Sequence, residues 1–190
     1  MLKRRIITLA TAVVMLGGIT TSASLALAGG AAGGATPVSG QTQIWASLGP
    51  SNGTGFNVVF TGAIGDHGTS IGATKNGKST KKQNPGYRLF ILKKGTIFFN
   101  TKTIDAAENN NNTAPTTVNT TTCSATFVVT DPVTAISGTK AYAGIKGTID
   151  VTISYAFTLP LDKGKCNLNT NANPSASIGL VTGTGTVSYG

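Results

Sequence analysis

Acidic residues and histidine are scarce in this chain of 190 residues, which has six acids and a single histidine, His67. A metal site requires several histidine, cysteine or carboxylate ligands that converge on one point, and the sequence shows no such grouping. We also predict neither the nucleophile elbow of serine hydrolases nor a phosphate-binding loop. The sequence therefore predicts no catalytic residue, no metal and no cofactor.

The one adjacent acid–base pair, Asp66 and His67, is a poor catalytic candidate. Neighbouring residues of an extended strand point to opposite faces, so their side chains diverge. The flanking Gly65 and Gly68 are typical of a bend, and turn formation explains both polar residues.

Long apolar runs are lacking after residue 28, so no later segment is predicted to cross a membrane. Before it, three basic residues precede an apolar stretch, and Ala26–Ala28 supplies the small residues of a cleavage site. We interpret residues 1–28 as a bacterial secretory signal peptide. An uncleaved anchor is the less favoured alternative, because the apolar run is short and interrupted by glycine and threonine.

Cleavage after Ala28 would leave 162 residues, which is enough for one domain with its own core. Residues 29–41 are rich in glycine and alanine and are predicted to form a flexible tail. Residues 42–190 are predicted to form a single domain. The expected location is extracellular, with attachment to the cell envelope as an alternative.

Cysteine occurs only twice, at Cys123 and Cys166. In an exported chain an even pair predicts a structural disulfide. A redox role is less favoured because the sequence has no Cys-x-x-Cys motif.

Without the signal peptide, twelve basic and six acidic residues remain, a net charge of about +6. Four of the lysines, at positions 75, 78, 81 and 82, lie in a polar stretch with glycine and proline. That stretch has no aromatic residues for base stacking, so we predict no nucleic-acid binding. Solubility is the favoured explanation of the charge, and an anionic cell-wall polymer or lipid surface is the alternative.

The clearest strand spans residues 149–158, where apolar and polar residues alternate with a period of two. About eight strands are predicted in all, with a long exposed loop at residues 105–122 and no helix after the signal peptide. This pattern predicts an all-β protein, an antiparallel eight-stranded barrel or a β-sandwich, because both alternate identically. The other expected strands are residues 43–48, 56–61, 70–74, 87–93, 96–101, 124–130 (ended by Asp131-Pro132) and 178–189.

Three blocks resemble the secreted bacterial relatives of the allene oxide cyclase and dirigent family: Phe60–Asp66, Tyr87–Thr96 and Gly138–Gly147. The third is similar to a Gly-Thr-x-x-Tyr-x-Gly-Ile-x-Gly pattern before a long strand. The resemblance implies a calycin-like eight-stranded barrel whose lumen can hold a small apolar molecule. The resemblance implies members that direct the reaction of an unstable fatty-acid epoxide or the coupling of phenoxy radicals. The polar lumen residues of those members have no assigned counterparts in this chain.

Four residues are candidates for ligand contact. Tyr142, Tyr155 and Phe157 would line a lumen, or else pack in an ordinary core. Arg88 lies in an otherwise apolar strand and would anchor a carboxylate if it pointed inward. An outward, solvated Arg88 is the expected arrangement.

The favoured function is a secreted barrel that binds a small lipophilic molecule without turnover. The alternatives are a structural or adhesive module of the cell envelope and, after it, an isomerase or cyclase of the allene oxide cyclase type. No surface pattern indicates a homo-oligomer.

Overall fold

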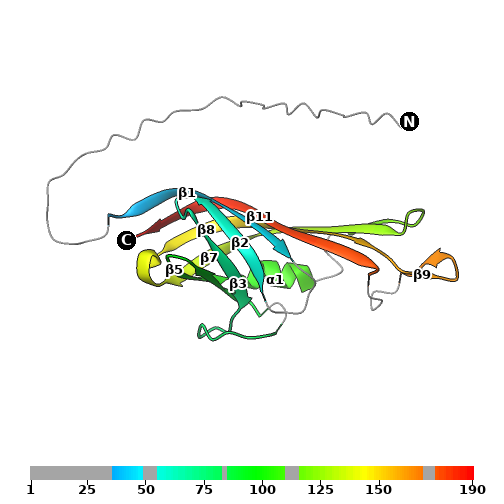
Figure 1. Cartoon of the computed structure of the whole chain (residues 1–190), viewed down its shortest axis with the longest axis horizontal. Coiled ribbons are helices and arrows are strands. Elements are labelled where there is room, and N and C mark those ends of the chain that lie inside the picture. The colour runs from blue at the N-terminus through cyan, green and yellow to red at the C-terminus, as the bar shows by residue number, and fades with distance from the viewer. Residues whose placement is uncertain (1–35, 49–54, 83–84, 110–115, 169–173) are drawn as a thin grey trace, which may run out of the picture. The chain divides into compact units, whose positions relative to one another are not determined.

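β-strands make up most of the chain that the computed structural model describes, which comprises residues 36–48, 55–82, 85–109, 116–168 and 174–190. These residues lie in one structural unit, and the predicted signal peptide lies outside them. Figure 1 shows the strands with a short helix beneath them. The strands are β1 (Val38–Leu48), β2 (Phe56–Gly62), β3 (Asp66–Gly72), β4 (Tyr87–Leu92), β5 (Gly95–Asn100), β6 (Thr116–Asn119), β7 (Ser124–Gly138), β8 (Lys146–Thr158), β9 (Leu161–Asp162), β10 (Lys165–Cys166) and β11 (Ala176–Tyr189).

Eight of these strands form a closed antiparallel barrel. Their order is β5-β4-β3-β2-β1-β11-β8-β7, and a direct pairing of β5 with β7 closes the ring. That last pairing contains a bulge between Phe98 and Phe99, and a bulge adds the local bend that closure needs. The predicted barrel is confirmed, and the sandwich alternative is wrong.

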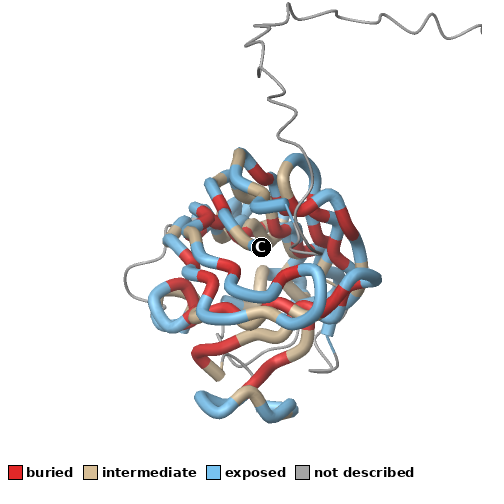
Figure 2. The backbone as a smooth tube through the Cα atoms, turned by 90° about the vertical axis from the view of Figure 1, so that its left-hand side faces the viewer, coloured by how far each residue is buried: buried red, intermediate tan, exposed pale blue. Residues whose placement is uncertain are grey.

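Alternation along each strand determines which side chains face the inside of the barrel. In β8, Ile149, Val151 and Ile153 are buried, whereas Thr148 and Asp150, on either side of Ile149, are exposed. Figure 2 shows the same change from buried to exposed along the other strands. The core combines aliphatic side chains with a group of aromatic rings, in which Phe90 packs edge-on at 5.3 Å from both Phe60 and Phe99.

Strand β7 continues past Asp131-Pro132, where the sequence predicted its end. Strand β6 pairs with β7 at residues 124–127, and β5 pairs with it at residues 134–138. Pro132 lies between these two pairings, so its missing N–H removes no hydrogen bond to β5 or β6. Its carbonyl oxygen accepts a hydrogen bond of 2.9 Å from Thr103 Oγ1.

Helix α1 (Lys102–Asn109) is a second correction, since this segment was expected to be without helix and largely a loop. The Asn100 side chain accepts a hydrogen bond from the backbone N–H of Lys102, as a helix cap does. Ile104 is buried in the barrel core. One buried apolar residue per two turns is too weak a pattern to predict such a short helix. We call the end of the barrel next to this helix the α1 end.

Two other boundaries differ from those expected. Strand β1 begins at Val38, before the predicted start of the domain at residue 42. Strand β3 includes part of the predicted glycine-rich bend. No helix in the described ranges has the length and apolar character needed to cross a membrane.

The Cys123–Cys166 disulfide is confirmed, with its Cα atoms 5.2 Å apart. It joins the residue before β7 to β10, which forms a two-stranded hairpin with β9. This hairpin pairs with no strand of the barrel among the described residues. The covalent bond therefore anchors a segment that has little other attachment.

We predict that replacing both cysteines by serine lowers the free energy of unfolding. The bridge spans a separation of 43 residues, and for a loop of that length the chain-entropy model gives about 4 kcal/mol. Urea unfolding of the double variant and of the oxidised wild type measures the difference. Equal unfolding midpoints and slopes for the two proteins would contradict the prediction.

Candidate functional site

The end of the barrel opposite α1 is organised by the carboxylate of Asp66, which is buried. It accepts hydrogen bonds from the Tyr142 hydroxyl at 2.6 Å and from the backbone N–H groups of His67 at 2.8 Å and Lys94 at 2.9 Å. Tyr142 belongs to the short 3-10 helix η1 (Lys140–Tyr142). We call these four groups the Asp66 hub.

The hydrogen bonds of the hub fully compensate the buried charge of Asp66. Burial raises the pKa of the Asp66 carboxyl, but its hydrogen bonds with Tyr142, Lys94 and His67 lower it by more, and the net pKa lies below the usual value. Burial and the bond to Asp66 raise the pKa of the Tyr142 hydroxyl well above its usual range. Tyr142 is fully buried and its proton is already donated, so we do not propose it as a ligand contact.

His67 takes part in the hub only through its backbone. Its side chain is exposed, whereas that of Asp66 is buried, so the two point to opposite faces of β3 as the alternation predicts. The imidazole and the carboxylate therefore make no acid–base pair.

Arg88 faces the inside of the barrel, so the expected outward orientation is wrong. Its partner in β5 is Phe99, which is buried in the core, and directly opposite residues of an antiparallel pair share a face. The Arg88 guanidinium carbon lies 5.0 Å from the centre of the Phe56 ring. A cation in this position is attracted to the ring face.

Arg88 belongs to a polar and aromatic group at the α1 end, which we call the α1-end cluster. On the opposite wall, the Tyr155 hydroxyl donates a 2.8 Å hydrogen bond to Glu108 of α1. Burial, then the charge of Glu108 and the hydrogen bond to it, raises the pKa of Tyr155 well above its usual range, although the Arg88 charge acts against this. The cluster comprises Phe56, Ser70, Arg88, Asp105, Glu108, Phe127, Tyr155 and Phe157.

Asp105 is the buried acid of this cluster. Its Oδ2 atom accepts hydrogen bonds from the backbone N–H of Gly86 at 2.7 Å and from Thr101 Oγ1 at 3.1 Å. Burial raises the pKa of Asp105, and these bonds and the Arg88 charge offset only part of that increase. The Arg88 charge acts on Asp105 and on Tyr155, and Tyr155 is hydrogen-bonded to Glu108. The cation is therefore already opposed by acids.

Ser70 is the unexpected member of the cluster. It is fully buried, and its Oγ atom has no hydrogen-bond partner among the described residues. Its partners in the neighbouring strands are Phe56 and Phe90, so it lies on the same inner face as these rings. Buried hydroxyl groups are rarely left in this state, and such a group requires an explanation.

Aromatic side chains form the rest of the α1 end. The rings of Phe127 and Tyr155 lie 6.0 Å apart, and Phe157 follows Tyr155 on the same face of β8. All three are half-buried, whereas the rings at the barrel centre are fully packed. A Cβ atom at Gly179 would lie 2.7 Å from the Tyr155 ring, so the ring occupies space that only glycine leaves open.

Two stretches have the residue spacing of catalytic motifs, although neither has the required context. Gly68–Gly72 reads Gly-x-Ser-x-Gly around Ser70, but Ser70 lies within a strand and the one histidine is exposed. Gly72–Ser79 reads Gly-x-x-x-x-Gly-Lys-Ser, but the next element among the described residues is strand β4 and not a helix. A nucleophile elbow and a phosphate-binding loop both need a strand-to-helix turn.

The described residues contain no group of three or more potential metal ligands. Comparison of the chain with protein-family models, with curated proteins and with solved structures found no match. The site must therefore be interpreted from its own chemistry.

We predict that Asp66 and Asp105 affect stability with opposite pH dependence. The lowered pKa of Asp66 provides stability above its unfolded pKa, and this is lost as the pH falls through the folded value. The raised pKa of Asp105 has the opposite effect on the pH dependence of stability. Its contribution to the free energy of unfolding is most favourable at low pH and declines as the pH rises.

The measurement is the free energy of unfolding of the wild type, Asp66→Asn and Asp105→Asn from about pH 3 to about pH 7. The difference between wild type and Asp66→Asn should grow with pH, and that for Asp105→Asn should shrink. Parallel profiles for the two variants would show that the two carboxyls do not differ as described.

Proposed function

We propose that this protein binds a small, largely apolar molecule with an uncharged oxygen against the inner wall at the α1 end of its barrel. The observation that carries the proposal is Ser70, a fully buried inner-face hydroxyl without a partner among the described residues. A ligand oxygen would supply the hydrogen bond that the hydroxyl lacks.

The neighbours of Ser70 support this ligand class. The half-buried rings of Phe56, Phe127 and Phe157 offer apolar contact, and Arg88 offers further N–H donors. A carboxylate ligand, the class that an inward Arg88 would anchor, fits less well because Asp105 and Glu108 would repel it. A carbonyl or hydroxyl group meets the same donors without that repulsion.

Secretion of the protein and its relationship to the allene oxide cyclase and dirigent family remain part of the proposal. The disulfide is typical of an oxidising compartment. The closed eight-stranded barrel is the architecture that the family resemblance implied.

An isomerase or cyclase is the second candidate, because it requires polar side chains that converge inside the barrel. Arg88, Tyr155 and Glu108 meet this condition at the α1 end. The high pKa of Tyr155 keeps its hydroxyl protonated, so it would not act as a base. Because that proton is donated to Glu108, the Tyr155 oxygen is left to accept a hydrogen bond from a ligand. We assign no chemical step.

The test compares 2-octanone with octanoate in calorimetric titrations of the wild type, Ser70→Ala and Thr69→Ala. We expect 2-octanone to bind and octanoate to bind more weakly. Ser70→Ala should weaken binding of 2-octanone by about fivefold, the value of one hydrogen bond. Thr69→Ala, at the exposed neighbour on the same strand, should change nothing.

The same variant gives a second, independent readout. Without ligand, Ser70→Ala should raise the free energy of unfolding by about 1 kcal/mol, because it removes a buried hydroxyl that has no partner. Increased stability together with weaker binding is the result for a binding residue. Decreased stability with unchanged binding would contradict the proposal.

A further inference from the structure

The loops and turns that border the outer side of β3, β4 and β5 carry an unbalanced positive charge. Residues 67–104 contain eight basic residues and no acid. Seven of the eight are exposed lysines, and only Arg88 points inward. The acids that border this segment in sequence, Asp66 and Asp105, are both buried. We call this outer surface, together with the loop of residues 73–82, the cationic wall.

A groove with a volume of about 350 Å³ lies on the cationic wall. Its floor is apolar and formed by Leu89, Phe98 and Ile136, the last of which is 46% exposed. These residues belong to β4, β5 and β7, where Phe90 and Phe99 face inward and their neighbours face out. The groove is therefore separate from the α1-end cluster. Its rim is formed by Lys75, Asn76, Gly77, Thr96, Ser137, Gly138 and Thr139.

The floor of the groove is held in place from one side. The ring of Phe98 stacks on that of Tyr87 with centroids 5.5 Å apart, and Lys102 Nζ lies 5.1 Å from the Tyr87 ring. Tyr87 is itself buried. A fixed aromatic floor needs little ordering when a ligand binds, which favours affinity.

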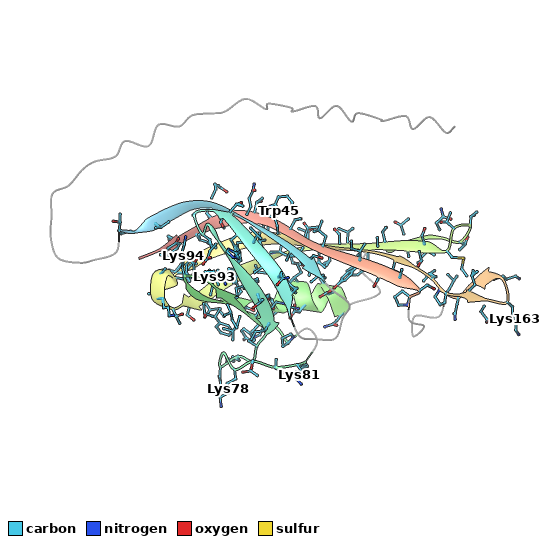
Figure 3. All side chains as sticks on the ribbon, viewed as in Figure 1. Trp45, Lys78, Lys81, Lys93, Lys94 and Lys163 are labelled. Atoms are coloured by element: carbon cyan, nitrogen blue, oxygen red, sulfur yellow. A yellow bond between two sulfur atoms is a disulfide. The ribbon has the colours of Figure 1, made fainter. Side chains whose placement is uncertain are left out.

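Lysines flank the groove at both ends. Lys75 lies on one rim, and Lys78 follows in the same loop. At the other end, Lys140 follows Thr139 of the rim, and the Ala141 N–H donates a 3.2 Å hydrogen bond to the Lys94 carbonyl. The Lys94 ammonium donates to the Gly65 carbonyl, so Lys140 is the exposed cation beside the rim. Figure 3 shows Lys78 and Lys81 beneath the barrel and Lys93 and Lys94 at its left end. A polymeric ligand longer than the groove would reach the lysines beyond both of its ends.

We propose that the groove on the cationic wall binds an anionic polysaccharide. The apolar floor would contact the C–H faces of a sugar ring, and the threonine and serine hydroxyls of the rim would bond to sugar hydroxyls. Lysines at both ends would neutralise acidic groups of the sugars before and after that ring. This inference does not depend on the ligand proposed for the inside of the barrel.

The test uses an oligoalginate of about ten sugars, with neutral dextran and poly-glutamate as comparison polymers. We expect oligoalginate to bind, poly-glutamate to bind more weakly, and dextran not to bind. The combined change Lys75→Gln and Lys140→Gln should weaken oligoalginate binding by about tenfold, the upper range for two exposed charges. The matched control is Lys163→Gln with Lys165→Gln in the β9–β10 hairpin, none of whose residues lines the groove. Figure 3 shows Lys163 at the opposite end of the molecule from Lys93 and Lys94.

A third variant tests the contribution of the groove itself while the charge stays constant. Ser137→Ile fills the groove at an exposed position without changing the net charge, and it should also abolish the preference for oligoalginate over poly-glutamate. Three results would overturn the proposal: no binding of oligoalginate, equal loss of binding in the hairpin control, or full binding in Ser137→Ile. Equal binding of poly-glutamate by the wild type would also overturn it, because it would indicate an acidic protein as the partner.

Discussion

The buried carboxylate of Asp66 determines how one end of the barrel is built. A buried charge is stable only when hydrogen bonds replace its hydration, and here the donors come from β3, from the β4–β5 turn and from η1. The glycine-rich block before β8 serves this arrangement. A Cβ atom at Gly138 would collide with the Tyr142 carbonyl oxygen, so glycine there lets η1 fold back and bring the Tyr142 hydroxyl to Asp66.

The two ends of the barrel therefore differ in what they leave unsatisfied. At the Asp66 hub, the polar groups satisfy one another, and the aromatic centre beyond it is fully packed. At the α1 end, aromatic side chains are only half-buried and Ser70 has no partner among the described residues. A ligand is consequently expected at the α1 end, and the hub acts as the rigid base that holds the strands in register.

The fold could be predicted from the sequence because it depends on short-range patterns. Alternation in residues 149–158 marks β8, and two cysteines in an exported chain predict the disulfide. The site was less predictable because it depends on long-range placement. Arg88 shares the inner face of β4 with Phe90 and Leu92, but the other face of this strand is also apolar, so the sequence did not show which face was inside. The role of Glu108 depends on helix α1, and Ser70 carries no sequence signal other than a motif spacing whose usual context is absent.

The most direct test of the binding account is mass spectrometry of the protein purified from the culture medium of its own host. It would be sprayed under native conditions and then denatured. The account predicts an additional small mass that survives native spraying and leaves on denaturation, on a chain that begins after Ala28 and lacks two hydrogens at Cys123 and Cys166. A bare chain of that mass under both conditions would contradict the binding account.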